Sequence, residues 1–174
     1  WIFHELVDFI NIKRGRWVTV HYGENLNFEF EYKNVTVRFY HEKYFTRGAG
    51  YAWAFSSKPD FTVMVDDKII ALFDAKNYHE KSGGLHDASE QMLGYMANLD
   101  CDYAGLVFAN IPGGRDPMTL TSEPPSRRFH KKMELSLMRM TPSDDRDGIS
   151  SKEQTLQSMF DVIIQKIPVI AHVK

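Results

Sequence analysis

The sequence predicts an α/β domain with a mixed β-sheet flanked by helices. Three observations support this fold class: apolar residues at helical spacing near both ends of the chain, several short segments of alternating apolar and polar residues, and one almost continuous apolar segment near residue 105. The predicted order is a helix, several strands, a helix, a strand, and then a strand and a helix. This order is typical of a sheet covered by helices. A chain of 174 residues can bury one sizeable core, so we assign residues 1–174 to a single domain.

The first half of the domain is predicted to contain one helix and several strands. Residues 1–12 carry apolar side chains at helical spacing. Residues 17–41 include the segments NFEFEY and NVTVRFY, which alternate like strands and are rich in residues that favour strands. A link rich in glycine and aromatic residues follows over 46–55. The apolar segments 60–65 and 69–76 then predict a β-hairpin.

The second half continues the sheet and adds an extension. The expected elements are a helix over about 85–99, a buried strand over 103–110, a long loop over 111–128, a strand over about 133–140 and a helix over about 152–167. Glycine and proline residues predict the loop, which is long enough to be functional. Pro168 is expected to end the last helix. Residues 1 to about 110 therefore form the predicted core of the domain.

Charge and cysteine content exclude few classes of function. The formal net charge is −2, so the whole surface is not basic, as it often is in nucleic-acid-binding proteins. Cys101 is the single cysteine, which excludes an internal disulfide and fits a reducing compartment. No apolar segment approaches the roughly 18 residues of a transmembrane helix. We expect a cytoplasmic protein, and the start at Trp1 suggests a part of a longer one.

Basic residues gather in two places. One group lies near the start of the chain, and the other lies near residue 130: Lys13, Arg14 and Arg16; Arg127, Arg128, Lys131 and Lys132. Local groups of this kind permit phosphate binding even in a chain of low net charge. Solvated surface charge explains each group alone equally well.

The hairpin over 60–76 brings acidic residues together. If residues 66–68 form a three-residue loop, Asp60 lies directly opposite Asp74, with Cβ atoms roughly 5 Å apart. Two carboxylates at that separation repel each other unless a cation lies between them. Lys76 shares the face of Asp74 because it follows two positions later, and the carbonyl of Ala75 offers a further oxygen. Such an oxygen-rich group of ligands suits Mg²⁺.

A simpler interpretation of the same residues exists. Asp60 could cap the turn after Pro59, and Asp74 with Lys76 could form an ordinary ion pair at a strand end. The apolar segment IIALF that leads into Asp74 favours a functional interpretation, because charged groups at the end of a buried strand are costly without a partner.

These residues resemble the PD-(D/E)XK nuclease superfamily. Its motif appears as Pro59-Asp60, followed by Asp74-Ala75-Lys76 on the next strand. The family core of a helix, three strands, a helix and a strand matches the order predicted for residues 1 to about 110. Gln91 and Tyr95 are similar to the Gln-x-x-x-Tyr element of RecB-like branches. DAKNY followed by QMLGYMANL resembles the nuclease subunits of restriction systems of the McrBC kind.

The resemblance implies a restriction-endonuclease-like core and a metal-dependent nuclease, with DNA rather than RNA as substrate. Asp60, Asp74, the carbonyl of Ala75 and Glu5 on the first helix would hold Mg²⁺ or Mn²⁺. Lys76 would position the attacking water, and Gln91 and Tyr95 would support it. The residues expected to steer the nucleic-acid backbone are Arg115, Arg127, Arg128, Lys131 and Lys132.

Two further alternatives follow from the same residues. Glu42 could replace Glu5 as the third acid, because it lies near the end of a predicted strand. The chain could instead be a catalytically inactive, nucleic-acid-binding or structural module on the same fold. The resemblance also implies assembly as a homodimer or in a larger complex with an NTPase.

Overall fold

The structure, a computed structural model, describes residues 1–76, 84–122, 132–141 and 151–171, with side chains described as far as residue 167. Two helical segments are followed by five strands, a helix, three strands and a last helix. They are α1 (Ile2–Asp8), η1 (Phe9–Lys13, a π-helix), β1 (Thr19–His21), β2 (Asn27–Tyr32), β3 (Val35–His41), β4 (Phe61–Val65), β5 (Lys68–Lys76), α2 (Gly84–Asn98), β6 (Tyr103–Phe108), β7 (Met118–Thr121), β8 (Glu134–Arg139) and α3 (Ser151–Ala171).

The strands form one mixed sheet in the order β1-β2-β3-β4-β5-β6-β8-β7. Neighbours from β1 to β5 are antiparallel, β5, β6 and β8 are parallel, and β7 pairs antiparallel with β8. The parallel step from β5 to β6 includes α2, as expected because parallel neighbours need a long crossover. The predicted α/β class with a central mixed sheet is confirmed, and it is consistent with a restriction-endonuclease-like core.

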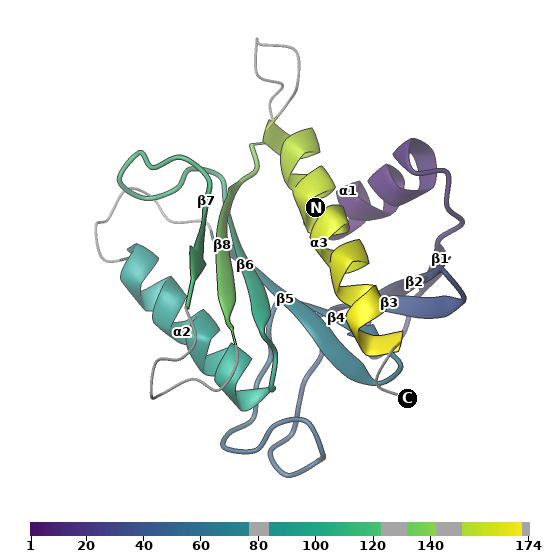
Figure 1. Cartoon of the computed structure of the whole chain (residues 1–174), viewed down its shortest axis with the longest axis horizontal. Helices are drawn as coiled ribbons and strands as arrows, with labels where there is room; N and C mark the ends of the chain where they lie inside the picture. Colours follow the sequence, from purple (N-terminus) through teal and green to yellow (C-terminus); the bar gives the residue numbers. More distant parts are fainter. Residues whose placement is uncertain (77–83, 123–131, 142–150, 172–174) are drawn as a thin grey trace.

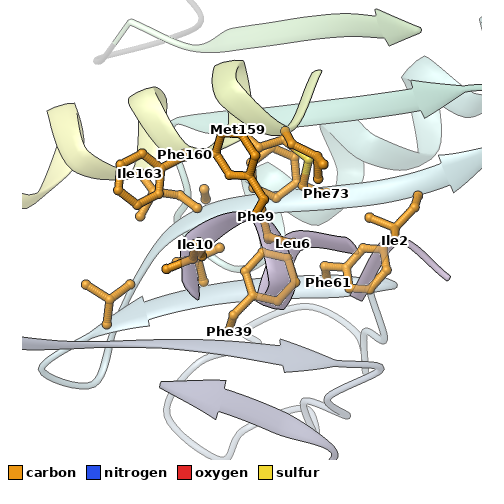
Figure 2. Packing of buried hydrophobic residues seen from close by; sticks show 14 of the residues in the cluster. Ile2, Leu6, Phe9, Ile10, Phe39, Phe61, Phe73, Met159, Phe160 and Ile163 are labelled. Carbon is orange, nitrogen blue, oxygen red and sulfur yellow. The ribbon is translucent and has the colours of Figure 1, made fainter. Parts of the chain in front are cut away.

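Helices cover both faces of the sheet (Figure 1). α1 and α3 pack on one side, which we call the α1/α3 face, where Leu6 and Phe160 join Phe39 and Phe73 in one buried cluster (Figure 2). α2 packs on the other side, the α2 face, through Met92 and its buried neighbours. The result is three layers in which β4, β5 and β6 are buried on both faces along most of their length.

Aromatic rings fill the α1/α3 face. Phe28 stacks on Phe39 with ring centroids 4.9 Å apart, and Phe73 meets Tyr103 edge to face at 6.0 Å. Gly105 in β6 makes room for this arrangement, because a Cβ atom there would lie 2.6 Å from Cδ1 of Phe73. The glycine is therefore required by the close approach of an aromatic ring to the β6 backbone.

Two predicted helices differ from the structure at their C-terminal ends. The helix predicted over 1–12 changes to a π-helix at Phe9. The last helix continues through Pro168 to Ala171, so the predicted end was wrong. Proline removes one backbone donor, and this close to the end of a helix few further hydrogen bonds depend on it.

A strand also occurs where only a loop was predicted. β7 lies inside the segment 111–128, and all four of its residues are exposed. Met118 and Leu120 alternate with threonines, but four residues are too short a pattern to indicate a strand, and β7 is held by pairing with β8. Among the described helices, none has the length and apolar character needed to cross a membrane.

Candidate active site

A β-bulge in β5 decides which face of the sheet carries Asp74. The hairpin turn contains two residues, Asp66 and Asp67, because Val65 pairs with Lys68, so the predicted three-residue loop was wrong. The pairing then shifts by one residue, which leaves Ile70 without a partner on β4. Ile70 and the next residue, Ala71, both join the cluster on the α1/α3 face.

The shift restores the pairing expected at the other end of the hairpin. Phe61 faces Phe73, and one step further Asp60 lies across from Asp74. A one-residue slip turns every later side chain to the opposite face of a sheet. If the same residues paired regularly from the turn onward, with no bulge, Asp74 would point to the α1/α3 face, away from Asp60. The extra residue in β5 therefore brings the two carboxylates to the same side.

The two aspartates contact each other through backbone and side chain. Oδ2 of Asp60 accepts a hydrogen bond from the N–H of Ala75 at 2.8 Å. The N–H of Asp60 donates to Oδ1 of Asp74 at 3.4 Å. Asp74 is only 4% exposed. Its Oδ2 has the ammonium of Lys76 as an ion-pair partner but no aligned hydrogen-bond donor among the described residues.

Crowding of the carboxylates changes the acidity of Asp60. The pKa of Asp60 is raised from 3.8 to about 6, mainly by burial and then by the charge and hydrogen bonding of Asp74. The N–H of Ala75 and the ammonium of Lys76 act in the opposite direction. A carboxyl group with a raised pKa beside a second carboxylate indicates a place where negative charge lacks sufficient compensation.

Side chains from α2 hold Lys76 in position. Nζ of Lys76 donates to Oε1 of Gln91 at 2.9 Å, and Nε2 of Gln91 donates to the hydroxyl of Tyr95 at 3.0 Å. Gln91 and Tyr95 are one helical turn apart, so they share a face of α2. Lys76 is thus fixed between Asp74 and the helix that covers the same side of the sheet.

The predicted third acid lies elsewhere. Glu5 pairs with Lys152 of α3 at 3.1 Å, in a cavity of about 270 Å³ between α1 and α3. The N–H of Glu42 donates to the carbonyl of Asp60 at 2.7 Å, but its carboxylate pairs with Lys58 at 2.6 Å. Within the described residues, no three His, Cys, Asp or Glu side chains converge as a metal-binding group.

The predicted basic residues are only partly described. Arg115 is exposed beside β7, and Lys132 forms an ion pair with Glu134 at 2.7 Å. Arg127, Arg128 and Lys131 lie outside the described residues. In the N-terminal group, Lys13 pairs with Glu153, while Arg14 and Arg16 lie over aromatic rings. The N-terminal group therefore has structural contacts that its sequence pattern did not reveal.

Asn98 is an organising residue that the sequence patterns missed. It is 1% exposed at the end of α2 and hydrogen-bonds the link that precedes Asp60. The amide oxygen accepts from the N–H groups of Ala54 and Phe55, and the amide nitrogen donates to the carbonyl of Phe55 and to the hydroxyl of Ser57. The available signal was a polar residue beside the apolar helix positions Tyr95, Met96 and Leu99.

Comparison with known proteins adds a distant structural likeness. No family model matches the sequence, and no curated protein matches it. Among solved structures, the chain is similar to one described as a refined half-complex from the tetradecameric assembly of Thermococcus gammatolerans McrB AAA+ hexamers with bound McrC. The TM-score is 0.45 at 12% identity, over 71% of this chain and 28% of that one. The present chain thus spans less than a third of that chain, and a likeness at this level carries no information about activity.

Proposed function

We propose that this chain is a metal-dependent nuclease of the PD-(D/E)XK type that hydrolyses phosphodiester bonds in DNA. One observation carries the proposal: Asp60, Asp74 and Lys76 meet on one face of the sheet, where the carboxylates are crowded and partly buried. Burial of like charges is unfavourable in a purely structural role, because desolvation and repulsion both oppose it. A divalent cation between the carboxylates would offset both effects.

The oxygen atoms at this site fit a magnesium or manganese ion. Asp60 and Asp74 would hold it, and Oδ2 of Asp74 is a buried oxygen that has the Lys76 ammonium as ion-pair partner but no aligned hydrogen-bond donor in the described part of the chain. The carbonyl of Ala75 would add a ligand, since its N–H already faces Asp60 and both backbone groups of one strand residue point to the same neighbour. Glu5 stays a prediction as a further ligand, with Glu42 as its alternative. When bound, the ion would activate a water molecule and neutralise charge on the phosphate.

Lys76 would act on the developing charge of the reacting phosphate. Its ammonium is held by Gln91 and Asp74, so little reorientation is needed as charge builds up. Gln91 and Tyr95 would act through Lys76 as positioning residues. Arg115, Arg127, Arg128, Lys131 and Lys132 would steer the nucleic-acid backbone toward this face. A restriction, defence or repair role in the cytoplasm, as a homodimer or with an NTPase, belongs to the same proposal.

A second candidate function is an inactive nucleic-acid-binding or structural module on the same fold. The observation that favours it is the lack of a third acid beside Asp60 and Asp74 within the described residues. The main role of Lys76 would then be to neutralise the charge of Asp74. Cleavage assays separate the two functions.

Supercoiled and circular single-stranded DNA are suitable substrates, because both report internal cuts. We expect cleavage with Mg²⁺ or Mn²⁺ and none with chelator. Lys76→Met should retain folding and affinity but cut roughly 100- to 1000-fold more slowly, since it removes an interaction that strengthens in the transition state. Asp74→Asn should be inactive. If Lys76→Met cuts as fast as the wild type, the catalytic assignment is wrong.

A further inference from the structure

The segment between β3 and β4 presents aromatic rings on a rigid backbone. We call residues 43–58 the strap; its only charged residues are Lys43, Arg47 and Lys58. The underside is buried, with Phe45 and Ala52 in the cluster on the α2 face. The outer side exposes Trp53 (72%) and Phe55 (46%), and Tyr44 is exposed as well. An ordered segment that exposes several large rings is unusual for a loop with no partner.

Hydrogen bonds fix the backbone of the strap from both sides. Phe45 and Ser57 exchange backbone hydrogen bonds of 2.8 and 3.0 Å, which closes the segment at its base. Asn98 of α2 uses its whole amide group on residues 54–57, with four hydrogen bonds of 2.6 to 3.2 Å. The exposed rings therefore stand on a preorganised support, which lowers the entropy lost on binding.

The Trp53 ring is itself held while remaining exposed. Its indole Nε1 donates to the carbonyl of Ala97 on α2 at 3.0 Å. That hydrogen bond satisfies the polar atom of the ring and fixes its orientation, although most of the residue is in contact with solvent. A fixed, exposed indole is suited to stacking against another flat group.

One face of α2 connects the strap with the candidate active site. Gln91 holds Lys76, Gly94 lies beside the ring of Phe55, and Asn98 anchors the strap backbone. Helix positions three and four apart lie on one side, so these contacts follow each other along a single stripe. The strap also leads within a few residues into Asp60.

We infer that the strap is a stacking platform for unpaired bases of a single-stranded nucleic acid that approaches the Asp60–Asp74 site. The inference rests on the proposed function and names its substrate class. Aromatic rings bind bases by stacking with little regard to sequence, provided that the bases are not paired in a duplex. The strap sequence has no acidic residue, which suits contact with a polyanion. The nearby acidic residues Asp66, Asp67 and Asp100 line a pocket beside Tyr51 and belong to other segments.

Charge is expected to contribute little to this contact. The ammonium of Lys43 lies 3.8 Å from the centre of the Tyr40 ring, and Lys58 is paired with Glu42. Stacking should therefore dominate, and removal of a ring should weaken binding without changing its salt dependence. Loss of a phosphate contact would instead flatten the salt dependence.

Tryptophan fluorescence tests the platform directly. Trp1, Trp17 and Trp53 are the three tryptophans, so the double variant Trp1→Phe, Trp17→Phe leaves Trp53 as the sole reporter. The probe is a fluorescein-labelled oligothymidine for anisotropy and the same unlabelled strand for quenching, with Ca²⁺ in place of Mg²⁺ to prevent turnover. We expect saturable quenching of Trp53 by the single strand and much weaker quenching by a duplex of equal length.

Two variants and a control measure the contribution of the rings to affinity. Trp53→Ala and Phe55→Ala should each weaken single-strand binding about 5- to 150-fold with an unchanged salt slope. Trp17→Ala removes a ring that is 92% exposed just before β1, and it should bind like the wild type. Circular dichroism checks that each variant is folded.

The outcomes distinguish the platform from the nuclease. Unquenched Trp53 at saturating single strand, wild-type affinity of both strap variants, or absence of single-strand binding by the wild type would overturn the platform. Quenching by single strands in a chain that never cleaves DNA would support the platform and contradict the nuclease. Metal-dependent cleavage by a protein whose Trp53 fluorescence is not quenched would support the nuclease and contradict the platform.

Discussion

The charge state of Asp60 is strongly affected by its surroundings. Its pKa is raised to about 6 because the carboxyl group is partly buried and lies beside Asp74. A group whose pKa is raised on folding stabilises the folded state below its unfolded pKa, here 3.8, and this contribution is lost as pH rises through about 6. The metal-free protein should therefore lose this contribution between about pH 4 and pH 6.

Asp60→Asn should remove the repulsion and the metal response together. Asparagine keeps an oxygen that can accept the N–H of Ala75, so the local backbone contact is preserved. With chelator at pH 7.5, the thermal midpoint of the variant should exceed that of the wild type. Millimolar Mn²⁺ should raise the wild-type midpoint more at pH 7.5 than at pH 5, because binding requires ionised carboxylates. A variant that still responds to Mn²⁺ would contradict the metal site, and Glu24→Gln, an exposed acid on a turn, is the matched control.

Gln91 offers a test of positioning at the same scale. Gln91→Leu removes the acceptor for Lys76, so cleavage should fall roughly 10- to 100-fold with little change in KM. Gln91→Glu keeps an acceptor oxygen and should restore most of the rate. Glu90→Gln alters the adjacent exposed position and serves as control. Equal cleavage rates for Gln91→Leu and the wild type would show that Gln91 does not position Lys76 for cleavage.

The hairpin turn between β4 and β5 allows a prediction about one element. Asp66 and Asp67 both adopt positive φ angles, 45° and 62°, which fits a type I′ turn. Asn-Gly is preferred in that turn, so Asp66→Asn with Asp67→Gly should stabilise the fold by about 0.5–1 kcal/mol. Urea unfolding measures the change in midpoint, and the cleavage rate should be unaltered. A lower midpoint would show that the acidic side chains contribute more than the turn geometry.

Most elements could be predicted from the sequence because their apolar periods are clear. β2, β3, β4, β5, β6, β8 and α2 lie within a residue or two of the predicted segments. β1 lies inside the segment 17–41 that was predicted to form strands, whereas β7 at the other sheet edge was not predicted and has no buried residue. The bulge at Ile70 was also invisible, because an extra apolar residue inside an apolar run leaves no gap in the pattern.

The arrangement at the candidate site shows the same limit. The pairing of Asp60 with Asp74 was predicted from a three-residue turn. The real turn has two residues, and the bulge in β5 supplies the extra residue that restores the same pairing. The helical spacing of Gln91 and Tyr95 predicted a shared face, and in the structure Gln91 accepts a hydrogen bond from Lys76 and donates one to Tyr95. The partner of Glu5 could not be predicted, because it depends on how α3 packs against α1.

At the scale of the whole molecule, the three layers depend on a close fit at Gly105. Gly105→Ala would place a methyl group 2.6 Å from a ring carbon of Phe73, so Phe73 must move against the other aromatic rings. We expect a loss of about 1–3 kcal/mol in the free energy of unfolding. Gly23→Ala is the matched control, since no atom lies within 4 Å of its added carbon. Equal stability of the two variants in urea would show that the core adapts more freely than the packing indicates.

The bulge in β5 has a consequence for how such a hairpin can diverge or be redesigned. Asp60 and Asp74 are 14 positions apart, and two backbones satisfy that spacing: a two-residue turn with a bulge, or a three-residue turn with regular strands. A compensated edit that deletes Ile70 and inserts one residue after Asp67 should keep both carboxylates on the α2 face. Deletion of Ile70 alone should also keep them there, because it joins the pair Met64–Ile69 to the pair Val63–Ala71 as regular strands and leaves Asp74 across from Asp60. The facing of the two carboxylates therefore depends on the pairing of the strands near Asp60 and Asp74, and hairpins of different total length can preserve it.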